Sequence, residues 1–291
     1  MAMKSIGKAS FPLLVLTLLS CSGPSTSASL SESESKEDSF DASSSSVYEK
    51  IDLADINAKF YGPIAHRGYH GSSNPKNSMS AFKEAAKVGF AIETDVHITA
   101  DDALIISHDS YLEGYGNIET NDFEDIRSNV LLENGEELPS LGEAFEFSKE
   151  TDTPIFLELK TFSPDEENPL RLANAVLKEA RKYEISAKNL LICSFSWEAI
   201  IPFLCSEYAA GLFISNGTNK ELIGTVLAAE SPTANYPDFV AAGYDVTPKA
   251  ECKSYRQKGH KVFSWTLISQ SMYDEQQTIS DGFIFEGFFP V

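Results

Sequence analysis

Short apolar runs of strand length alternate with helix-forming stretches along most of this 291-residue chain. The alternation is typical of parallel βα units, in which a helix connects one strand of a sheet to the next. It occupies about 240 residues, which is the usual size of one (β/α)8 barrel and long for two small domains. The pattern therefore predicts an α/β fold, specifically an irregular (β/α)8 TIM barrel.

Eight apolar runs are predicted to be strands. They are Pro63–Arg67, Phe90–Ile98, Leu104–Ser107, Pro154–Lys160, Leu190–Phe195, Ala209–Ile214, Lys261–Thr266 and Gly282–Phe285. Only residues 99–103 separate the second run from the third, too few for the crossover helix that parallel strands need. This pair therefore forms a hairpin, or a turn replaces one helix of the barrel. A helix is expected to start at Thr247-Pro248, while the segment 216–237 has no clear assignment.

The first 58 residues differ in composition from the rest. The apolar run Phe11–Leu19 follows two lysines and is shorter than the ~20 residues that span a bilayer, so it fits the core of a signal peptide. It leads into Leu18-Leu19-Ser20-Cys21, which resembles a bacterial lipobox. Residues 1–21 are thus predicted to be a lipoprotein signal peptide, residues 22–58 a disordered Ser-rich, acidic tether, and residues 59–291 the barrel domain.

This organisation predicts an exported protein of the cell envelope, held at a bacterial membrane by a lipid on Cys21; it leaves the membrane and its face open. The formal net charge is −20 and no basic cluster occurs, which argues against a nucleic-acid partner. Besides Cys21 the chain has Cys193, Cys205 and Cys252. An odd number at wide spacing predicts neither a disulfide framework nor a zinc motif.

Three carboxylates lie in otherwise apolar strands. Glu93 and Asp95 are two residues apart in one strand, so their side chains share a face, and Glu158 lies near the end of another strand. Burying such groups is costly unless they bind something. Oxygen ligands are those that hard cations take, whereas zinc prefers His or Cys. These residues are therefore the predicted ligands of a divalent cation, Ca²⁺ or Mg²⁺.

Two histidines and two cations accompany these acids. His66 and His108 each end an apolar strand, and histidine is the natural proton carrier near neutral pH. Arg67 directly follows His66, and Lys160 lies two residues after Glu158. Arg binds phosphate through paired hydrogen bonds and Lys supplies a point charge. A phosphate ester together with a cation would satisfy all these groups, although each basic residue can also form an ion pair with the acids.

Five motifs follow one another along the chain. They are His66-Arg67-Gly68, Asn74-Pro75-Lys76-Asn77-Ser78, Glu93-Thr94-Asp95-Val96, His108-Asp109 and Glu158-Leu159-Lys160. In this order and spacing the chain resembles the glycerophosphodiester phosphodiesterase family. Ser194-Phe195, Trp265-Thr266 and Asp281-Gly282-Phe283-Ile284 are similar to further segments of the family. The resemblance covers about residues 60–290; any one motif is weak, but five in order are specific.

The resemblance implies roles for individual residues. His66 and His108 would be general acid and general base, and Glu93, Asp95 and Glu158 match the family's metal ligands. Substrate contacts would come from Arg67, Lys160, Asn77 and Trp265. Two of these have a simpler alternative: Asn77 can merely cap a helix, and Trp265 can merely fill the barrel mouth.

The chain departs from the family pattern at four places. Lys76 stands where the family has Glu, and Asp102-Ala103 replaces an Asp-Gly turn. Leu267-Ile268 and Phe285-Glu286 replace Val-Asn and Thr-Asp. Lys76 is expected at the barrel mouth, where its charge would attract an anionic substrate and weaken the local attraction for a cation, unless it points to water.

The resemblance thus implies metal-dependent hydrolysis of a small-molecule phosphodiester, a glycerophosphodiester, to glycerol 3-phosphate and an alcohol. One alternative is a related enzyme that acts on lysophospholipid or on a glycerophosphate polymer of the envelope. Another is a non-catalytic lipoprotein that binds phosphate esters, against which the presence of both His66 and His108 argues. The leaving alcohol, the metal, the role of each histidine and the oligomeric state stay open.

Overall fold

The computed structural model describes residues 48–161, 168–229, 236–247 and 250–291, and eight parallel strands of these residues form a closed barrel. The strands are β1 (Pro63–His66), β2 (Ala91–Ile98), β6 (Ile155–Leu159), β7 (Leu190–Ser194), β8 (Ala209–Ile214), β9 (Phe239–Gly243), β10 (Lys261–Leu267) and β11 (Gly282–Phe285). Their order around the barrel is β1-β11-β10-β9-β8-β7-β6-β2, and β1 pairs with β2 to close the ring. The predicted TIM barrel is confirmed.

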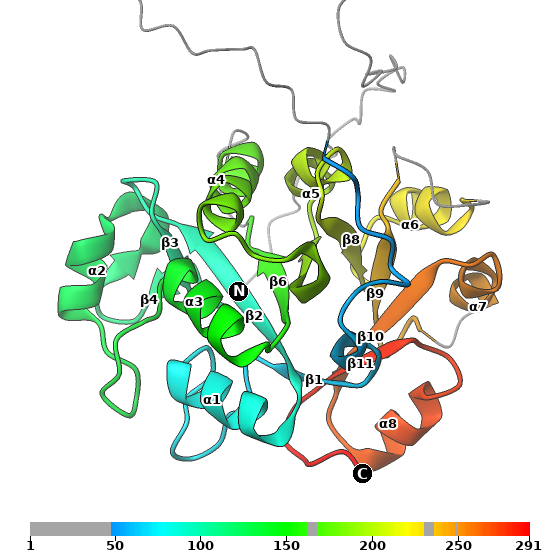
Figure 1. Cartoon of the computed structure of the whole chain (residues 1–291), viewed down its shortest axis with the longest axis horizontal. Coiled ribbons are helices and arrows are strands. Elements are labelled where there is room, and N and C mark those ends of the chain that lie inside the picture. Colours follow the sequence, from blue (N-terminus) through cyan, green and yellow to red (C-terminus); the bar gives the residue numbers. More distant parts are fainter. Residues whose placement is uncertain (1–47, 162–167, 230–235, 248–249) are drawn as a thin grey trace, which may run out of the picture. The chain divides into compact units, whose positions relative to one another are not determined.

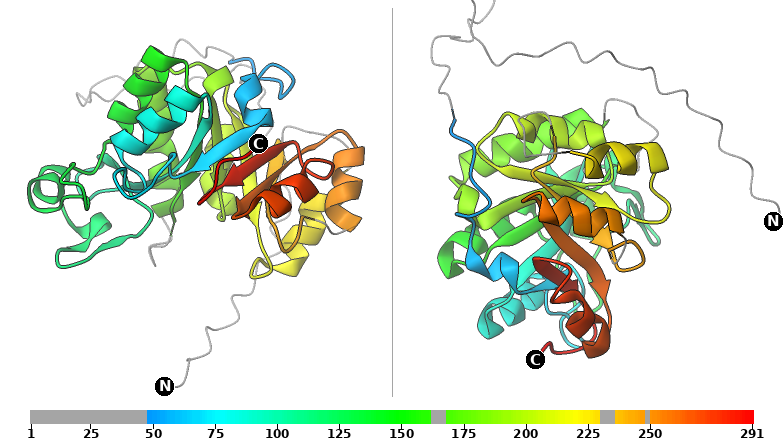
Figure 2. Two further views of the ribbon diagram at one scale, coloured as in Figure 1. Left: turned by 90° about the horizontal axis from the view of Figure 1, so that it is seen from below. Right: turned by 90° about the vertical axis from the view of Figure 1, so that its right-hand side faces the viewer.

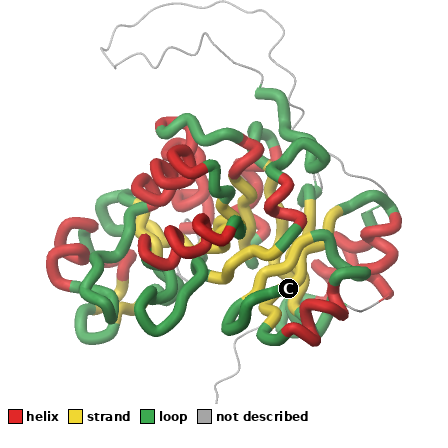
Figure 3. Tube along the Cα trace, turned by 60° about the horizontal axis from the view of Figure 1, so that its bottom comes forward, coloured by secondary structure: helices red, strands yellow, loops and turns green. Residues whose placement is uncertain are grey.

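Helices lie outside the strands, as Figures 1 and 3 show. The helices that connect successive barrel strands are α1 (Met79–Val88), α3 (Leu141–Thr151), α4 (Asn168–Lys182), α5 (Trp197–Leu204), α6 (Lys220–Leu227), α7 (Ala250–Gln257) and α8 (Gln270–Gln276). Local sequence fixes the starts of two of them: Ser140 and Glu143 form a capping box at α3, and Ser196 caps α5. The predicted helix start at Thr247-Pro248 includes Pro248, which lies outside the described residues.

The two-residue period of the strands separates two apolar layers. In β6, Ile155 and Leu157 pack toward the helices, whereas Phe156 packs inside the barrel. Inside, Phe156 contacts the rings of Phe213, Phe239 and Phe263, with centroids 5.4–5.9 Å away. Aromatic side chains thus fill the barrel interior, and the next inward position of β6 after Phe156 is Glu158.

The third predicted strand, Leu104–Ser107, does form, but it is not one of the eight parallel strands of the barrel. β3 (Leu104–Ile106) runs antiparallel to the end of β2, with Val96 opposite Ile106. The hairpin alternative is the one that the chain adopts, because β2 continues past the point where its pairing with β1 ends. The Ser107 N–H donates to the Asp95 carbonyl at 3.1 Å. The hairpin therefore returns the chain to the barrel mouth just before His108.

The barrel strand that sequence reasoning missed is β9, which pairs with β8 and β10. It reads Phe-Val-Ala-Ala-Gly, and its two alanines and terminal glycine carry little strand signal. In the structure, small residues of one strand lie beside large side chains of the neighbouring strand. Gly211 of β8, for instance, lies against the ring of Phe239, where a Cβ would come within 2.3 Å of ring carbons.

An insertion follows His108 and precedes α3. It holds β4 (Tyr111–Leu112), β5 (Gly116–Asn117), a short 3-10 turn and α2 (Phe123–Asn129). Its small core contains Leu112, Ile118, Ile126 and Leu138, together with Ile105 of β3. In the left view of Figure 2 this segment projects from the side of the barrel.

The N-terminal boundary of the packed region lies before residue 59. Ile56 is buried, and the Ile51 N–H donates to the Glu207 carbonyl at 3.0 Å, followed by a 3-10 turn at Ala58–Tyr61. The predicted signal peptide and most of the predicted tether, residues 1–47, lie outside the described residues. Among the helices that the structure describes, none is both long enough and apolar enough to cross a bilayer.

Candidate active site

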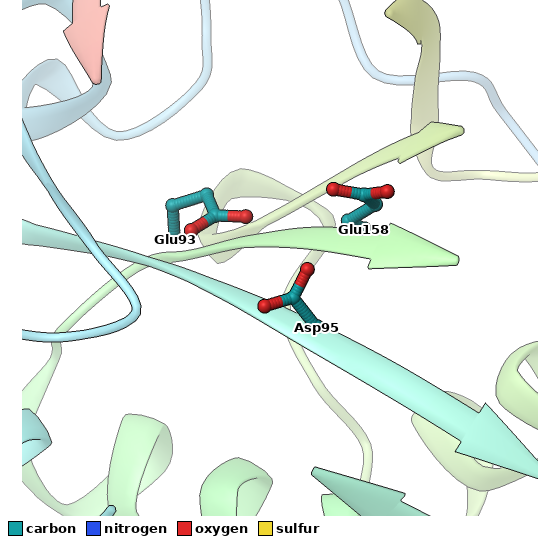
Figure 4. A group of neighbouring side chains, drawn as sticks. All are labelled: Glu93, Asp95 and Glu158. Atoms are coloured by element: carbon teal, nitrogen blue, oxygen red, sulfur yellow. The ribbon is translucent and has the colours of Figure 1, made fainter. Parts of the chain in front are cut away.

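The three predicted metal ligands converge at the carboxyl end of the barrel. Strand register accounts for this, because Asp95 of β2 stands beside Glu158 of β6. One oxygen from each of Glu93, Asp95 and Glu158 lies within 4.8 Å of the others, and all three side chains are buried. Figure 4 shows the carboxylates of the two neighbouring strands directed toward one another.

The burial of these acids makes their charges costly. Burial, followed by the charges of Asp95 and Glu158, raises the pKa of Glu93 well above its ordinary value. Burial and Asp95 raise the pKa of Glu158 to about 8. Burial also acts to raise the pKa of Asp95, but Lys160 and Arg67 outweigh it and leave that pKa lowered. The cluster therefore attracts positive charge, either a proton or a cation.

Two basic residues balance part of this charge. Lys160 Nζ lies 2.8 Å from Glu158 Oε1 and 3.3 Å from Asp95 Oδ1. Although burial alone would lower its pKa, these two carboxylates raise it, so Lys160 is a permanent cation. Arg67 Nε is 3.4 Å from Asp95 Oδ2, and the Arg67 backbone N–H donates to Glu93 Oε2 at 2.9 Å.

The residues present fit a hard divalent cation. Asp95 Oδ1 is buried and, apart from its ion pair with Lys160 Nζ at 3.3 Å, accepts no hydrogen bond from any described residue. Three acids against two cations leave one negative charge unmatched when all are ionised, a large cost in a buried site. A set of oxygen ligands alone suits Ca²⁺ or Mg²⁺, whereas a zinc site would include His or Cys ligands.

The two predicted catalytic histidines line the same pocket. His66 ends β1 beside Glu93 in the register, and its Nε2 lies 3.9 Å from Glu93 Oε2. His108 follows the β2–β3 hairpin, and its Nδ1 lies 2.8 Å from Asp109 Oδ1. Burial lowers the pKa of His108, and the charge of Asp95 opposes this. Two imidazoles therefore line one acidic pocket, one from the end of β1 and the other from the loop after β3.

The structure also places the predicted substrate residues Asn77 and Trp265. Ser78, not Asn77, caps α1. The Asn77 amide instead donates to Asp95 Oδ2 at 2.9 Å and accepts from the Thr94 hydroxyl at 2.7 Å, so it orients a carboxylate of the cluster. The Trp265 Nε1–H donates to the Ala241 carbonyl at 2.8 Å, which fixes the indole at the mouth.

A pocket of about 250 Å³ opens beside these groups. Its lining includes the charged and titratable residues His66, Arg67, Glu93, His108, Glu158 and Lys160. It also includes three aromatic side chains: Phe195 stacks on Phe213 with centroids 5.2 Å apart, and Trp265 meets both rings edge-on. Such a pocket can hold both the charged part and an apolar or hydroxylated part of an ester.

Glu286 is a residue of the site that sequence reasoning noted only as a departure from the family pattern. It directly follows β11, and its Oε2 lies 2.7 Å from His66 Nδ1 and 3.1 Å from Lys76 Nζ. The hydrogen bond from His66 and the charge of Lys76 hold the pKa of Glu286 well below its usual range. The available signal was its place directly after the last strand, at the end of the barrel where active sites lie. Lys76 is thus at the mouth as expected, paired with an acid.

Fold and site together define a (β/α)8 barrel with a polar, acidic active-site pocket at the carboxyl ends of its strands. Residues 66–286 match the model of the Glycerophosphoryl diester phosphodiesterase family. This match covers more than half of the chain, and the protein belongs to that family.

Curated relatives match over shorter segments. A probable glycerophosphodiester phosphodiesterase 2 of Mycobacterium tuberculosis is 42% identical over 83 residues, which are 27% of this chain and 31% of that protein. Glycerophosphodiester phosphodiesterase 1 of Bos taurus is 32% identical over 151 residues, which are 47% of this chain and 43% of that protein. The chain thus spans less than half the length of these two relatives.

Solved structures share the fold over a larger part of the chain. A glycerophosphodiester phosphodiesterase from Parabacteroides distasonis superposes with a TM-score of 0.65 at 23% identity. The match covers 77% of this chain and 92% of that one. At this identity the likeness supports the barrel architecture.

Proposed function

We propose that this chain hydrolyses glycerophosphodiesters to glycerol 3-phosphate and an alcohol, in a reaction that depends on a divalent cation. The observation that carries the proposal is the pocket in which two histidines face three buried carboxylates, Arg67 and Lys160. The family to which the chain belongs acts on this class of ester. Phosphate binding alone would not need two proton carriers.

The residues divide the chemistry between them. One of His66 and His108 takes the proton of the glycerol 2-hydroxyl as its oxygen attacks phosphorus, and the other protonates the alcohol oxygen as its bond to phosphorus breaks. Water then opens the cyclic phosphate with the two roles reversed. Arg67 and Lys160 stabilise the negative charge that develops on the phosphoryl oxygens.

Glu93, Asp95 and Glu158 would hold the cation. When bound, it would polarise the phosphoryl group and neutralise developing charge. Asn77 keeps the Asp95 carboxylate in place through its amide, and the Arg67 backbone N–H does the same for Glu93. Both donors are uncharged N–H groups, so they orient the carboxylates and leave the negative charge available to the cation.

The test is a release assay for glycerol 3-phosphate over a panel of glycerophosphodiesters that differ in their alcohol. Release in the presence of Ca²⁺ or Mg²⁺, its loss in excess chelator and its recovery on adding either cation are expected. If no member of the panel yields glycerol 3-phosphate with either cation, the proposed activity is wrong. Full activity in chelator would overturn the proposed cation dependence.

A second candidate is hydrolysis of amphiphilic glycerophosphodiesters such as lysophospholipids. It is favoured by exposed apolar side chains directly after the carboxyl ends of β7 and β10. Phe195 and Ile268 are 36% and 61% exposed, on the same end of the barrel as the pocket. A lipid-anchored domain with an apolar rim would meet substrates in a bilayer. Comparing the release of choline from glycerophosphocholine and from lysophosphatidylcholine distinguishes the two candidates.

A further inference from the structure

Three basic side chains meet at one oxygen at the barrel mouth. Glu286 Oε2 is 2.7 Å from His66 Nδ1, 3.1 Å from Lys76 Nζ and 3.4 Å from His70 Nε2. Residues 66 and 286 are 220 positions apart, but β1 and β11 are neighbours, and Ala65 stands opposite Phe285 in their register. Barrel closure therefore brings Glu286 beside His66.

The contact constrains the imidazole of His66. An ionised carboxylate only accepts hydrogen bonds, so the short contact requires that Nδ1 carry a proton. The ring's other nitrogen, Nε2, then points away from Glu286, 3.9 Å from Glu93 Oε2, where the pocket opens. A partner that fixes the tautomer and orientation of a histidine in this way determines which ring nitrogen is left for chemistry.

Lys76 keeps the carboxylate where His66 needs it. Its ammonium neutralises Glu286 from the solvent side, with Lys76 itself 45% exposed and Glu286 25% exposed. Lys76 and Glu286 are two of the positions at which the chain departs from the family pattern, and they contact each other. The corresponding pair at His108 is weaker, because Asp109 is 78% exposed and water competes for its oxygens.

We infer that Glu286, held in place by Lys76, is a positioning residue for His66: it keeps the ring oriented and the proton on Nδ1, so that Nε2 exchanges protons with the substrate. The kinetic consequences of this inference rest on the proposed function, but the tautomer of His66 is a property of the protein alone. One measurement therefore tests the tautomer and another tests its effect on catalysis.

The first measurement needs no activity. In the full chain labelled with ¹⁵N-histidine, the His66 signals, identified by their loss in His66→Ala, are recorded at a pH well above the ordinary pKa of histidine. Protonated Nδ1 and unprotonated Nε2 are expected in the wild type, with a shift toward the Nε2–H tautomer in Glu286→Ala. A wild-type ring with its proton on Nε2 would overturn the inference even in an active enzyme.

The second measurement is kinetic. Glu286→Ala should lower kcat by about 10–100-fold, the range seen when a carboxylate that orients a metal-bound histidine is removed, with KM changed less than about threefold. Glu286→Asp should recover part of the loss, and Lys76→Met should lower kcat by a few-fold. Glu207→Gln is the matched control. It removes a carboxylate of similar exposure that pairs with Arg181. Glu207 lies just before β8, at the end of the barrel opposite the pocket, so its replacement should leave kcat unchanged.

A double-mutant comparison shows whether Glu286 acts through His66. In a His66→Ala background, Glu286→Ala should cause no further loss of kcat. An equal further loss there would mean that Glu286 acts elsewhere and would overturn the inference. If the wild type releases no glycerol 3-phosphate, the proposed function fails, and the tautomer measurement alone decides whether Glu286 positions His66.

Discussion

Glu158 combines near-complete burial with a contact to Lys160 and a place in the carboxylate cluster. Its pKa of about 8 means that, when no metal ion is bound, a proton occupies this carboxylate in much of the protein near neutral pH. A divalent cation would displace that proton, because it relieves the repulsion from Asp95 and Glu93 as well. The same residue is therefore a sensitive probe of cation binding.

Glu158→Gln is expected to weaken Ca²⁺ or Mg²⁺ binding by an order of magnitude or more, since one anionic oxygen ligand is lost. Isothermal titration calorimetry of the purified domain measures this directly. Glu179→Gln, which removes a surface partner of Lys182, is the control and should bind the cation as the wild type does. Equal affinities of the Glu158 variant and the wild type would exclude this carboxylate as a ligand.

The two histidines make a second prediction at this scale. His66→Ala or His108→Ala should each lower kcat by ~10²–10⁴ while KM changes little, because proton transfer is lost and binding is kept. The double variant should be little worse than either single one, since both act in one step. Steady-state kinetics with glycerophosphodiesters measure this. A histidine whose replacement leaves kcat near the wild-type value has a structural role only.

A third histidine, His97, affects stability through protonation. It is fully buried, its Nε2–H donates to the His108 carbonyl at 3.2 Å, and its Nδ1 has no hydrogen-bond partner among the described residues. Burial lowers its pKa to about 4, whereas the unfolded chain would have the ordinary value of 6.5. The folded state thus binds fewer protons than the unfolded state between these values.

The stabilising contribution of neutral His97 is therefore complete above pH 6.5 and is lost as the pH falls toward 4. By about pH 5 the loss should be about 2 kcal/mol. Urea unfolding of the wild type and of His97→Gln, at neutral pH and near pH 5, measures it: the variant, which cannot be protonated, should lose less stability. Parallel losses in the two proteins would show that His97 is not the group responsible.

At the scale of elements, the local sequence pattern predicted the strands that hold the active-site residues, but it did not predict how every strand pairs. Glu93, Asp95 and Glu158 could be predicted to converge, because a two-residue period and parallel strand ends suffice. The hairpin of β3 and the missed strand β9 depend on pairing instead. The five residues that link β2 to β3 exclude a crossover helix but do not indicate which segment forms the next barrel strand. Ala241 and Ala242 of β9 have little strand preference of their own.

The part of the site that sequence reasoning missed depends on the closure of the sheet. The contact between Glu286 and His66 exists because the first and last strands of the barrel pair in one particular register. Nothing near either residue encodes that register. The role of Asn77 has a similar origin, because its neighbour Ser78 takes the helix cap and leaves the Asn77 amide free to bond Asp95.

The turn between β1 and α1 allows a prediction for an element. Gly68 has φ +79°, and a Cβ there would lie 2.8 Å from Ala81 Cβ and 2.9 Å from the Ala81 carbonyl carbon. Gly68→Ala should therefore destabilise the protein beyond the roughly 1–2 kcal/mol that the left-handed conformation alone costs. It should also lower kcat, because the turn holds His66 and Arg67.

Gly89→Ala is the matched control for this substitution. Gly89 ends the same helix with φ +84°, and a Cβ there would meet nothing within 4 Å, so its replacement carries the conformational cost without the clash. Denaturant unfolding of both variants separates the two effects. Equal losses of stability would mean that the turn moves aside at little cost and that close packing does not fix the position of His66.

At the scale of the whole molecule, the acidic pocket and the exposed apolar side chains Phe195 and Ile268 lie at the same end of the barrel. Membrane attachment through Cys21 would set how this end meets its substrates. A tether of a few tens of residues, Ser-rich and acidic, leaves a domain free to reorient above a bilayer. Anchoring should therefore matter little for soluble glycerophosphodiesters and more for substrates embedded in lipid.

Cys21→Ala tests this arrangement in cells and in vitro. The variant should lose its lipid, move from the membrane to the soluble fraction or accumulate as a precursor, and keep the wild-type kcat on glycerophosphocholine, because the barrel is untouched. With lysophosphatidylcholine in vesicles as substrate, its rate should fall relative to the anchored wild type, since attachment raises the local concentration of enzyme at the surface. Fractionation, metabolic labelling with a fatty acid and the two assays provide the measurements.

A mature wild-type protein without lipid in the soluble fraction would contradict the anchoring. Equal rates of the variant and the wild type on vesicles would show that anchoring does not speed the hydrolysis of membrane-embedded substrates.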